Sequence, residues 1–189
     1  MRLVREIISW LLHLAIAFVL AFLISMFVFQ PTYVEGRSME STLHDQDKVF
    51  ISKLIHTLNG VPGYGDIVVI DSRVERKRTL SDDLLETIRG NLITQFIFGL
   101  KPDQNYWIKR VIGKPGDVLV FEEDRIMRNG ELLIEPYVKE PAQYYSLGTV
   151  VVPEGHIFVM GDNRNHSRDS REIGCIPLTH VIGKYKFTF

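Results

Sequence analysis

The sequence predicts a mainly β protein, in which a single N-terminal transmembrane helix precedes a β-rich extracytoplasmic domain with a short helical insert. Three observations lead to this fold class. A long apolar run without formal charge opens the chain, short β-branched runs separated by glycine and proline follow it, and one later segment has helical spacing. With 189 residues, the chain is long enough for one domain of ordinary size beyond the apolar run.

The apolar run covers residues 7–29, which are 23 residues without a formal charge. As a helix rising about 1.5 Å per residue it would be about 34 Å long, enough for a hydrocarbon core of about 30 Å. Arg2 and Arg5 precede it, so residues 1–6 are expected in the cytoplasm and residues 30–189 outside. A cleaved signal peptide would have a shorter apolar core and a small-x-small exit, whereas this run exits through Phe-Gln-Pro-Thr-Tyr. We therefore expect a retained anchor.

Six short runs rich in β-branched and aromatic residues are expected to form strands. Asn129-Gly130 lies between two further apolar stretches and is a two-residue hairpin signal, because both turn positions need positive φ. Other turn residues separate the runs at 62–63, 114–117 and 153–155. The six expected strands are residues 48–51, 66–70, 107–112, 117–121, 156–160 and 181–187.

Residues 81–98 interrupt this β pattern and are expected to form an amphipathic helix. Ser81 is a helix N-cap residue, and two acidic residues, Asp82 and Asp83, follow it in the first turn. Apolar residues then repeat along one helical face, although Gly90 weakens the helix. This face can pack on the sheet or rest on the membrane, and the sequence does not decide between the two alternatives. It consists of Leu84, Leu85, Ile88, Leu92 and Phe96.

Composition excludes several kinds of function. The formal net charge of -1 gives no general attraction to nucleic acid, so no nucleic-acid partner is expected. The histidines are scattered and the single cysteine, Cys175, cannot by itself build a thiolate site, so no metal is expected. No glycine-rich loop opens a helix to bind a phosphate. We therefore expect no cofactor, and we expect Cys175 to be a small buried residue.

Ser38 is a candidate nucleophile in the stretch Gly-Arg-Ser-Met-Glu-Ser-Thr-Leu, residues 36–43, close to the end of the apolar run. The stretch lacks the second glycine and the strand-to-helix context of a G-x-S-x-G elbow. His44 is too close in sequence to be a clear base, and His166 is a weak candidate. A lysine can serve as the general base instead, if burial in an apolar pocket lowers its pKa toward about 7–8.

Lys109 meets this requirement, because it lies within an apolar run that is expected to be a strand. Alternation places Trp107, Lys109 and Val111 on one face of the strand and Arg110 on the other. Taken alone, a lysine in such a strand is more often exposed, since buried lysines are rare. A polar stretch at residues 161–174, Gly-Asp-Asn-Arg-Asn-His-Ser-Arg-Asp-Ser-Arg-Glu-Ile-Gly, is by itself typical of a solvated loop held by Asx turns.

Together, four stretches resemble the sequence boxes of the type I signal peptidases, the membrane-anchored serine-lysine endopeptidases that cut signal peptides from exported preproteins. In chain order they are residues 36–43, 65–70 (Gly-Asp-Ile-Val-Val-Ile), 107–117 (Trp-Ile-Lys-Arg-Val-Ile-Gly-Lys-Pro-Gly-Asp) and 161–174. The resemblance covers the anchor and most of the outer domain. It implies a signal-peptidase-like fold with a small β subregion at 118–152, and it places the helical insert where family members vary in length.

The same resemblance implies roles for particular residues. Ser38 would be the nucleophile that forms an acyl-enzyme, Lys109 its general base, and Ser167 the hydroxyl that orients the lysine amine. Arg110 matches a structural position beside the base. Three further residues match positions that hold the site together in family members, and they are Asp162, Asp169 and Arg171.

The resemblance also implies the substrate. A shallow apolar cleft would accept small side chains at the first and third residues before the scissile bond (P1 and P3), as in Ala-x-Ala sites. The backbone N–H of Ser38 would donate to the oxyanion. Gly36, where other members have a serine, follows the Gram-positive-like pattern and leaves a second donor open, and Ser41 replaces the usual proline. The cleft residues matched by position are Val34, Met39, Leu43, Trp107 and Ile108.

The expected partners are signal peptides of exported preproteins and membrane lipid, with a location in the cell membrane near the secretion translocon. Two alternative functions remain. A catalytically silent membrane-anchored protein would hold signal peptides without cutting them, but both Ser38 and Lys109 are present. A self-cleaving repressor-type peptidase shares the serine-lysine chemistry, but the membrane span and the lack of a helix-turn-helix region argue against it.

Overall fold

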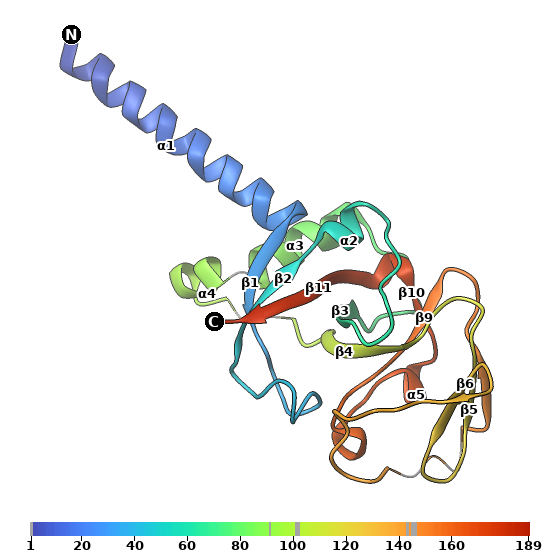
Figure 1. The fold of residues 1–189 in the computed structure, drawn as a ribbon. Coiled ribbons are helices and arrows are strands. Elements are labelled where there is room, and N and C mark those ends of the chain that lie inside the picture. Colours follow the sequence, from blue (N-terminus) through green and yellow to red (C-terminus); the bar gives the residue numbers. More distant parts are fainter. Residues whose placement is uncertain (1, 91, 101–102, 143, 145–146) are drawn as a thin grey trace.

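A computed structural model describes residues 2–90, 92–100, 103–142, 144 and 147–189. A long helix, α1 (Arg2–Phe27), projects from a body of two β-sheets and several short helices (Figure 1). None of the residues of α1 is buried. In the part of the chain that is described, α1 is the one helix long and apolar enough to cross a membrane. It ends before the predicted limit at residue 29, because Phe29 pairs with Ser52 in a sheet.

The larger sheet has seven strands in the order β1-β2-β11-β3-β4-β9-β10, and neighbouring strands are antiparallel. The smaller sheet has four strands in the order β7-β6-β5-β8 and lies within the region 118–152. The strands of the larger sheet are β1 (Phe29–Tyr33), β2 (Lys48–Ser52), β3 (Ile67–Asp71), β4 (Tyr106–Gly113), β9 (His156–Met160), β10 (Ile176–Pro177) and β11 (Val181–Thr188). Those of the smaller sheet are β5 (Val118–Phe121), β6 (Ile126–Arg128), β7 (Glu131–Leu132) and β8 (Thr149–Val151).

The predicted mainly β class is confirmed, and each of the six predicted runs coincides with a strand to within one residue at each end. The hairpin between β6 and β7 turns through Asn129 and Gly130, both at positive φ (54° and 84°). Strand β1 was not predicted, because Gln30 and Pro31 interrupt its apolar pattern. Its position at the edge of the sheet suits Pro31, which has no N–H to donate to a second neighbour.

The predicted helical insert consists of two helices instead of one. They are α3 (Leu80–Gly90) and α4 (Leu92–Phe98), and the residue between them lies outside the described part of the chain. Gly90 ends α3, in keeping with its low helix propensity. The remaining short helices are α2 (Leu54–Thr57), α5 (Ser170–Ile173) and the 3₁₀ turns η1 (Arg164–His166) and η2 (Leu178–His180).

Helix α3 turns polar residues toward the protein, which bears on the two alternatives for its apolar face. Glu86 and Thr87 are buried, and the Glu86 carboxylate forms an ion pair with the buried Lys53. Lys53 Nζ also donates to Thr87 Oγ1 at 3.1 Å, and Gln30 Nε2 donates to Glu86 Oε1 at 3.2 Å. A buried charge needs a partner of opposite charge, so this cluster sets the rotation of α3.

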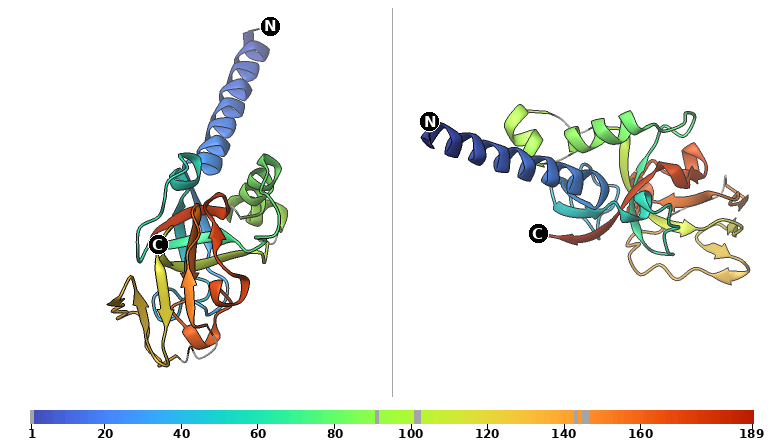
Figure 2. Two further views of the ribbon diagram at one scale, coloured as in Figure 1. Left: turned by 90° about the vertical axis from the view of Figure 1, so that its right-hand side faces the viewer. Right: turned by 90° about the horizontal axis from the view of Figure 1, so that it is seen from above.

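Several apolar residues of the insert consequently remain at the surface. Leu84 and Leu85 are exposed on α3, and Phe96 is 92% exposed on α4. Helix α3 contacts α1, and α4 lies against α3 and β1 (Figures 1 and 2). Of the two alternatives for the apolar face, packing on the sheet is therefore wrong for Leu84, Leu85 and Phe96.

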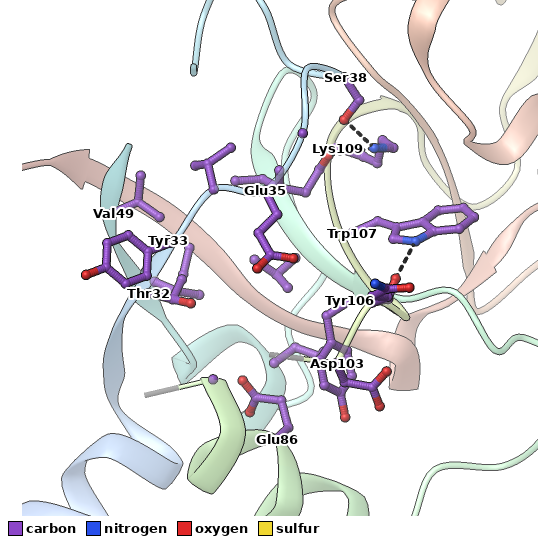
Figure 3. A pocket seen from close by; sticks show the side chains of 18 of the residues that line it. Thr32, Tyr33, Glu35, Ser38, Val49, Glu86, Asp103, Tyr106, Trp107 and Lys109 are labelled. Atoms are coloured by element: carbon purple, nitrogen blue, oxygen red, sulfur yellow. Dashed lines mark hydrogen bonds between the residues drawn. The ribbon is translucent and has the colours of Figure 1, made fainter. Parts of the chain in front are cut away.

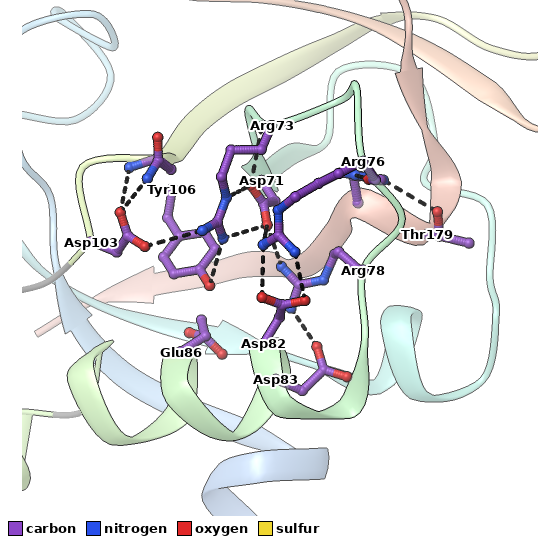
Figure 4. A network of polar contacts seen from close by, with 12 residues as sticks. Asp71, Arg73, Arg76, Arg78, Asp82, Asp83, Glu86, Asp103, Tyr106 and Thr179 are labelled. Carbon is purple, nitrogen blue, oxygen red and sulfur yellow. Dashed lines mark hydrogen bonds and ion pairs between the residues drawn. The ribbon is translucent and has the colours of Figure 1, made fainter.

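The loop before α3 is held by ion pairs around Asp71, which is fully buried at the end of β3 (Figure 4). Arg73 donates to both carboxylate oxygens of Asp71 at 2.7 Å, and Arg78 donates to Asp71 at 3.1 Å. Arg76 pairs with Asp82 in the first turn of α3. Burial alone would raise the pKa of Asp71, but the Arg73 hydrogen bonds hold it below its ordinary value. These contacts fix the insert to the larger sheet.

Candidate active site

The side chains of Ser38 and Lys109 meet although 71 residues separate them in the sequence. Ser38 opens a turn after β1, in which the N–H groups of Thr42 and Leu43 donate to the carbonyl of Met39. Lys109 extends from the middle of β4. The Lys109 Nζ lies 2.7 Å from Ser38 Oγ and donates to the Ile108 carbonyl at 3.0 Å (Figure 3). The turn and the strand thus bring the two candidate residues within hydrogen-bonding distance.

Lys109 is buried, with 4% of its surface exposed. Burial lowers its pKa to about 8, because an ammonium group loses its hydration there. The charges of Asp169 and Asp162 act in the opposite direction, and Arg171 adds to the lowering. The amine can therefore lose its proton near neutral pH, which an exposed lysine cannot do.

The backbone of Ser38 is held from the loop that follows β9. The N–H of Asn163 donates to the Ser38 carbonyl at 3.0 Å, and Asn163 Nδ2 donates to the Arg37 carbonyl at 3.2 Å. The N–H of Ser38 itself makes no hydrogen bond within the described residues. It is therefore free to donate to a substrate.

Gly161 allows this loop to approach the nucleophile turn. A Cβ on Gly161 would lie 2.5 Å from the Ser38 carbonyl oxygen and 2.2 Å from Ser167 Oγ, closer than real Cβ atoms come. The Gly161 N–H donates to Asp169 Oδ2 at 3.0 Å. No larger residue fits at this position without moving the Ser38 backbone.

Ser167, Asp169 and Arg171 form one cluster behind Gly161. Asp169 is fully buried, and Arg171 donates to both of its carboxylate oxygens, at 2.8 and 2.9 Å. The Ser167 hydroxyl donates to Asp169 Oδ2 at 2.8 Å. Burial would raise the pKa of Asp169, but Arg171, Gly161 and Ser167 hold it below its ordinary value. Among the described residues Ser167 makes no hydrogen bond to Lys109, so the orienting role of its hydroxyl stays a prediction.

Arg110 and Asp162 form a second cluster on the other face of β4. Arg110 donates to the two carboxylate oxygens of Asp162 at 2.8 and 2.6 Å, and to the Gly65 carbonyl at 2.8 Å. Thr42, in the turn that Ser38 opens, donates to Asp162 Oδ2 at 2.6 Å. Thr42 was not predicted as a site residue, although it lies in the same sequence box as Ser38. The cluster joins the nucleophile turn, β4 and the loop after β9.

Replacing Asp162 with alanine is expected to lower the free energy of unfolding by about 3–5 kcal/mol, because the buried Arg110 would lose its counter-charge. Thermal or urea unfolding of the two proteins would measure the change. Glu172→Ala, which breaks the exposed pair with Arg168, is the matched control and is expected to cost less than about 1 kcal/mol. Equal losses for the two variants would contradict the structural role of Asp162.

A third polar contact joins the site loop to residues between β7 and β8, and sequence reasoning missed it. Arg164 is buried and donates to both carboxylate oxygens of Glu135, at 2.7 and 2.6 Å, and to the Tyr144 hydroxyl at 2.7 Å. Its Nε donates to the Gly161 carbonyl at 3.0 Å. Arg164 lies in the last sequence box, but nothing near Glu135 in the sequence indicates its partner.

Ser38 and Lys109 line a cavity of about 470 Å³ (Figure 3). Val34, Trp107 and Ile108 also line it, as predicted from the sequence. Two other predicted cleft residues, Met39 and Leu43, are not among the lining residues. They are fully buried in a core cluster beneath it, because the turn after Ser38 points both side chains inward.

Two free strand edges flank this cavity. Strand β1 pairs with β2 on one side only, and it ends the sheet. The first half of β4, residues 106–109, pairs with β3, whereas its pairing with β9 begins at Arg110. Residues 32–35 and 106–109 both line the cavity. An extended peptide between them would find unpaired backbone N–H and C=O groups on both sides.

No group of three or more His, Cys, Asp and Glu side chains able to hold a metal occurs among the described residues. Cys175 is partly buried and packs against the core cluster under the smaller sheet, and burial raises the pKa of its thiol. Cys175 does not line the cavity.

The family model and the sequence relatives agree on one family. The model of the family described as signal peptidase, peptidase S26, matches residues 7–189. A signal peptidase I from Bacillus licheniformis is 35% identical over 195 residues, which cover 98% of this chain and 89% of that protein. A probable signal peptidase I-1 from Synechocystis is 36% identical over 176 residues, covering 93% and 79%. The crystal structure of a signal peptidase I from Enterococcus faecalis V583 matches with a TM-score of 0.43 and 24% identity, covering 66% of this chain and 97% of that one.

Proposed function

The chain belongs to the signal peptidase family, peptidase S26, and is a serine endopeptidase that removes signal peptides from preproteins; from this premise we propose that it cuts them at Ala-x-Ala-like sites with a serine-lysine dyad. Ser38 is the nucleophile and Lys109 the general base. The observation that carries the proposal is the 2.7 Å distance between Ser38 Oγ and Lys109 Nζ inside a cavity. A protein that only held signal peptides would have no use for a buried amine beside a serine hydroxyl.

In the proposed reaction, the neutral amine of Lys109 takes the proton of the Ser38 hydroxyl while Oγ attacks the carbonyl carbon of the scissile peptide bond. The ammonium then gives this proton to the leaving nitrogen, so the mature protein departs and the signal peptide stays as an ester on Ser38. Water attacks the ester with Lys109 again accepting a proton, which returns to Ser38 Oγ as the carboxylate of the signal peptide is released. A pKa of about 8 supports this role, since it leaves a usable fraction of neutral amine near neutral pH.

The neighbouring polar residues hold Ser38 and Lys109 in place or change the pKa of Lys109, without taking part in the bond changes themselves. The free N–H of Ser38 is the proposed donor to the oxyanion of the tetrahedral intermediate. Asp169, which Ser167 and Arg171 hold in place, raises the pKa of Lys109 through its charge. Ser167 is thus proposed to act on the amine through Asp169. Asp162 and Arg110 keep β4 beside the nucleophile turn.

The substrate is proposed to bind as an extended strand between the free edges of β1 and β4, which both line the cavity. Val34 and Ile108 provide apolar floor where the side chains at P1 and P3 lie, and Trp107 lines the wall. Ser38 and Lys109 line the same cavity as this floor, and we propose that it accepts small side chains at P1. This arrangement supports alanine at P1 and P3.

We further propose that α1 crosses the cell membrane once, with residues 1–6 in the cytoplasm and the catalytic domain outside, near the secretion translocon. The arginines before the apolar run support this orientation. Contact between the helical insert and membrane lipid is supported by α3, which contacts α1, and by α4, which exposes Phe96, Ile97 and Phe98. A signal peptide leaving the bilayer would then meet Ser38 close to the membrane surface.

Cleavage of a preprotein by the full chain in detergent micelles tests this proposed function. A preprotein with alanine at P1 and P3 is expected to be cut directly after P1, as the mass of the product shows. Replacing the P1 alanine with phenylalanine is expected to slow cleavage by about 10²-fold, because the side chain overfills the pocket. An alanine-to-phenylalanine change ten residues into the mature region is the control. Equal cleavage of all three preproteins would contradict the proposed specificity.

A further inference from the structure

Of the three carboxylates that line the cavity within the described chain, Glu35 alone has no partner. Glu86 and Asp103 form ion pairs with a lysine and an arginine of the protein itself. Glu35 makes neither a hydrogen bond nor an ion pair with any described residue, and it is exposed. Figure 3 shows its side chain pointing into the cavity, between Thr32 on one wall and Trp107 on the other.

Two arginines also line the cavity, but each has a carboxylate of its own. Arg37 pairs with Glu40 at 3.7 Å, and Arg168 pairs with Glu172 at 2.9 Å. These pairs leave Glu35 as the carboxylate that a cation entering the cavity would meet without displacing an existing ion pair.

Val34 and Glu35 directly follow β1, and the pairing continues there because the N–H of Val34 donates to the Asp47 carbonyl at 2.9 Å, so side chains still alternate. Val34 is buried in a core cluster against which Ile108 packs, so it forms the floor on one side of the proposed peptide site. The next residue, Glu35, points to the opposite side. In an extended peptide paired with the two free strand edges, successive side chains point to opposite faces, as they do in the neighbouring strands. If its P1 and P3 side chains face Val34, its P2 side chain faces Glu35.

We propose that Glu35 determines specificity at P2, where it favours lysine or arginine and disfavours aspartate and glutamate. The inference rests on the proposed function, because it requires cleavage of an extended peptide at Ser38. Glu35 is not among the charges that shift the pKa of Lys109, which are Asp169, Arg171 and Asp162. Its effect therefore lies in the choice of substrate and leaves the base unchanged.

The experiment compares kcat/KM for peptides that differ only at P2, with the P3 to P1 sequences Ala-Lys-Ala and Ala-Glu-Ala. The full chain in neutral detergent is expected to prefer lysine by about three- to tenfold at low salt, as attraction and repulsion at an exposed carboxylate predict. Glu35→Gln is expected to move this ratio toward one, and Glu35→Lys to bring it below one. Raising the salt concentration to about 0.5 M is expected to shrink the wild-type ratio.

Glu131→Lys provides the matched control, since Glu131 is an exposed glutamate on β7 of the smaller sheet and does not line the cavity. This variant carries the same change of net charge and is expected to keep the wild-type ratio. The same ratio in wild type and Glu35→Lys would overturn the inference while leaving the proposed function in place. Failure of the wild type to cut either peptide, or a third with glutamine at P2, would overturn the proposed function and the inference with it.

Discussion

Replacing Lys109 with methionine is expected to lower kcat/KM for preprotein cleavage by about 10³-fold or more, while the protein becomes more stable at pH 7. Methionine keeps most of the length of the lysine chain but cannot accept the proton of Ser38. The methionine side chain is apolar and suits a buried position better than an amine that must give up its hydration. Cleavage of a fluorogenic Ala-x-Ala peptide and thermal unfolding measure the two effects.

The gain in stability of Lys109→Met over the wild type should shrink as the pH rises. The pKa of Lys109 is about 8 when folded and about 10.5 in an unfolded chain, so between these values the unfolded chain binds more protons and stability rises with pH. The full cost of burial, roughly 3 kcal/mol, is present below pH 8 and fades toward pH 10.5. Lys109→Met should therefore exceed the wild type in stability at pH 7 and lose most of this advantage at pH 10.5.

The same pKa predicts the activity profile of the wild type. Below pH 8 the neutral fraction of the amine rises about tenfold per pH unit, so kcat/KM should rise with that slope and level off above pH 8. Lys186→Met, at an exposed lysine of β11, is the control and should keep both activity and profile. Lasting cleavage by Lys109→Met, or a flat wild-type profile between pH 6 and 8, would exclude Lys109 as the base.

The sequence predicts that Ser38 and Lys109 belong to one site, because each residue lies in a recognisable local stretch. Ser38 lies in a distinctive stretch after the apolar run, and Lys109 lies within a β-branched run whose alternation turns it away from Arg110. The partners of the supporting residues have no such signature. Thr42 and Asp162 are 120 residues apart, and Glu135 and Arg164 are 29 apart, so only the folded sheets bring them together. Met39 and Leu43 show the same limit, since pattern alone cannot separate a cleft residue from the core beneath it.

The helical insert shows how buried charge overrides apolar spacing. Its periodicity predicts one apolar face but not which way that face points; the buried Lys53 requires a carboxylate, and Glu86 supplies it from α3. Lys53 lies 33 residues before Glu86, so nothing within the insert indicates the pair. Helix α3 consequently turns its leucines outward.

Replacing Ser38 with alanine is expected to abolish cleavage, with a loss of about 10³-fold or more, while preprotein binding is retained. The Ser38 backbone keeps its N–H and its carbonyl contact with Asn163, and the free edges of β1 and β4 are unchanged. The variant should therefore hold uncut preprotein, which co-purification in detergent would detect. Lys109→Met fails for a different reason than Ser38→Ala, because it retains the Ser38 hydroxyl but lacks a base to activate it.

A matched control lies three residues further along the same turn. Ser41 makes no side-chain hydrogen bond to any described residue, and Ser41→Ala is expected to cleave preprotein as the wild type does. If Ser38→Ala still cut the preprotein, another residue would have to be the nucleophile. If Ser38→Ala lost binding as well as cleavage, with an unchanged unfolding temperature, the hydroxyl would be part of substrate recognition. The variant would then not hold uncut preprotein. If Ser38→Ala loses cleavage but still binds preprotein, Ser38 carries out the chemical step. The strand edges then hold the peptide without the help of the hydroxyl.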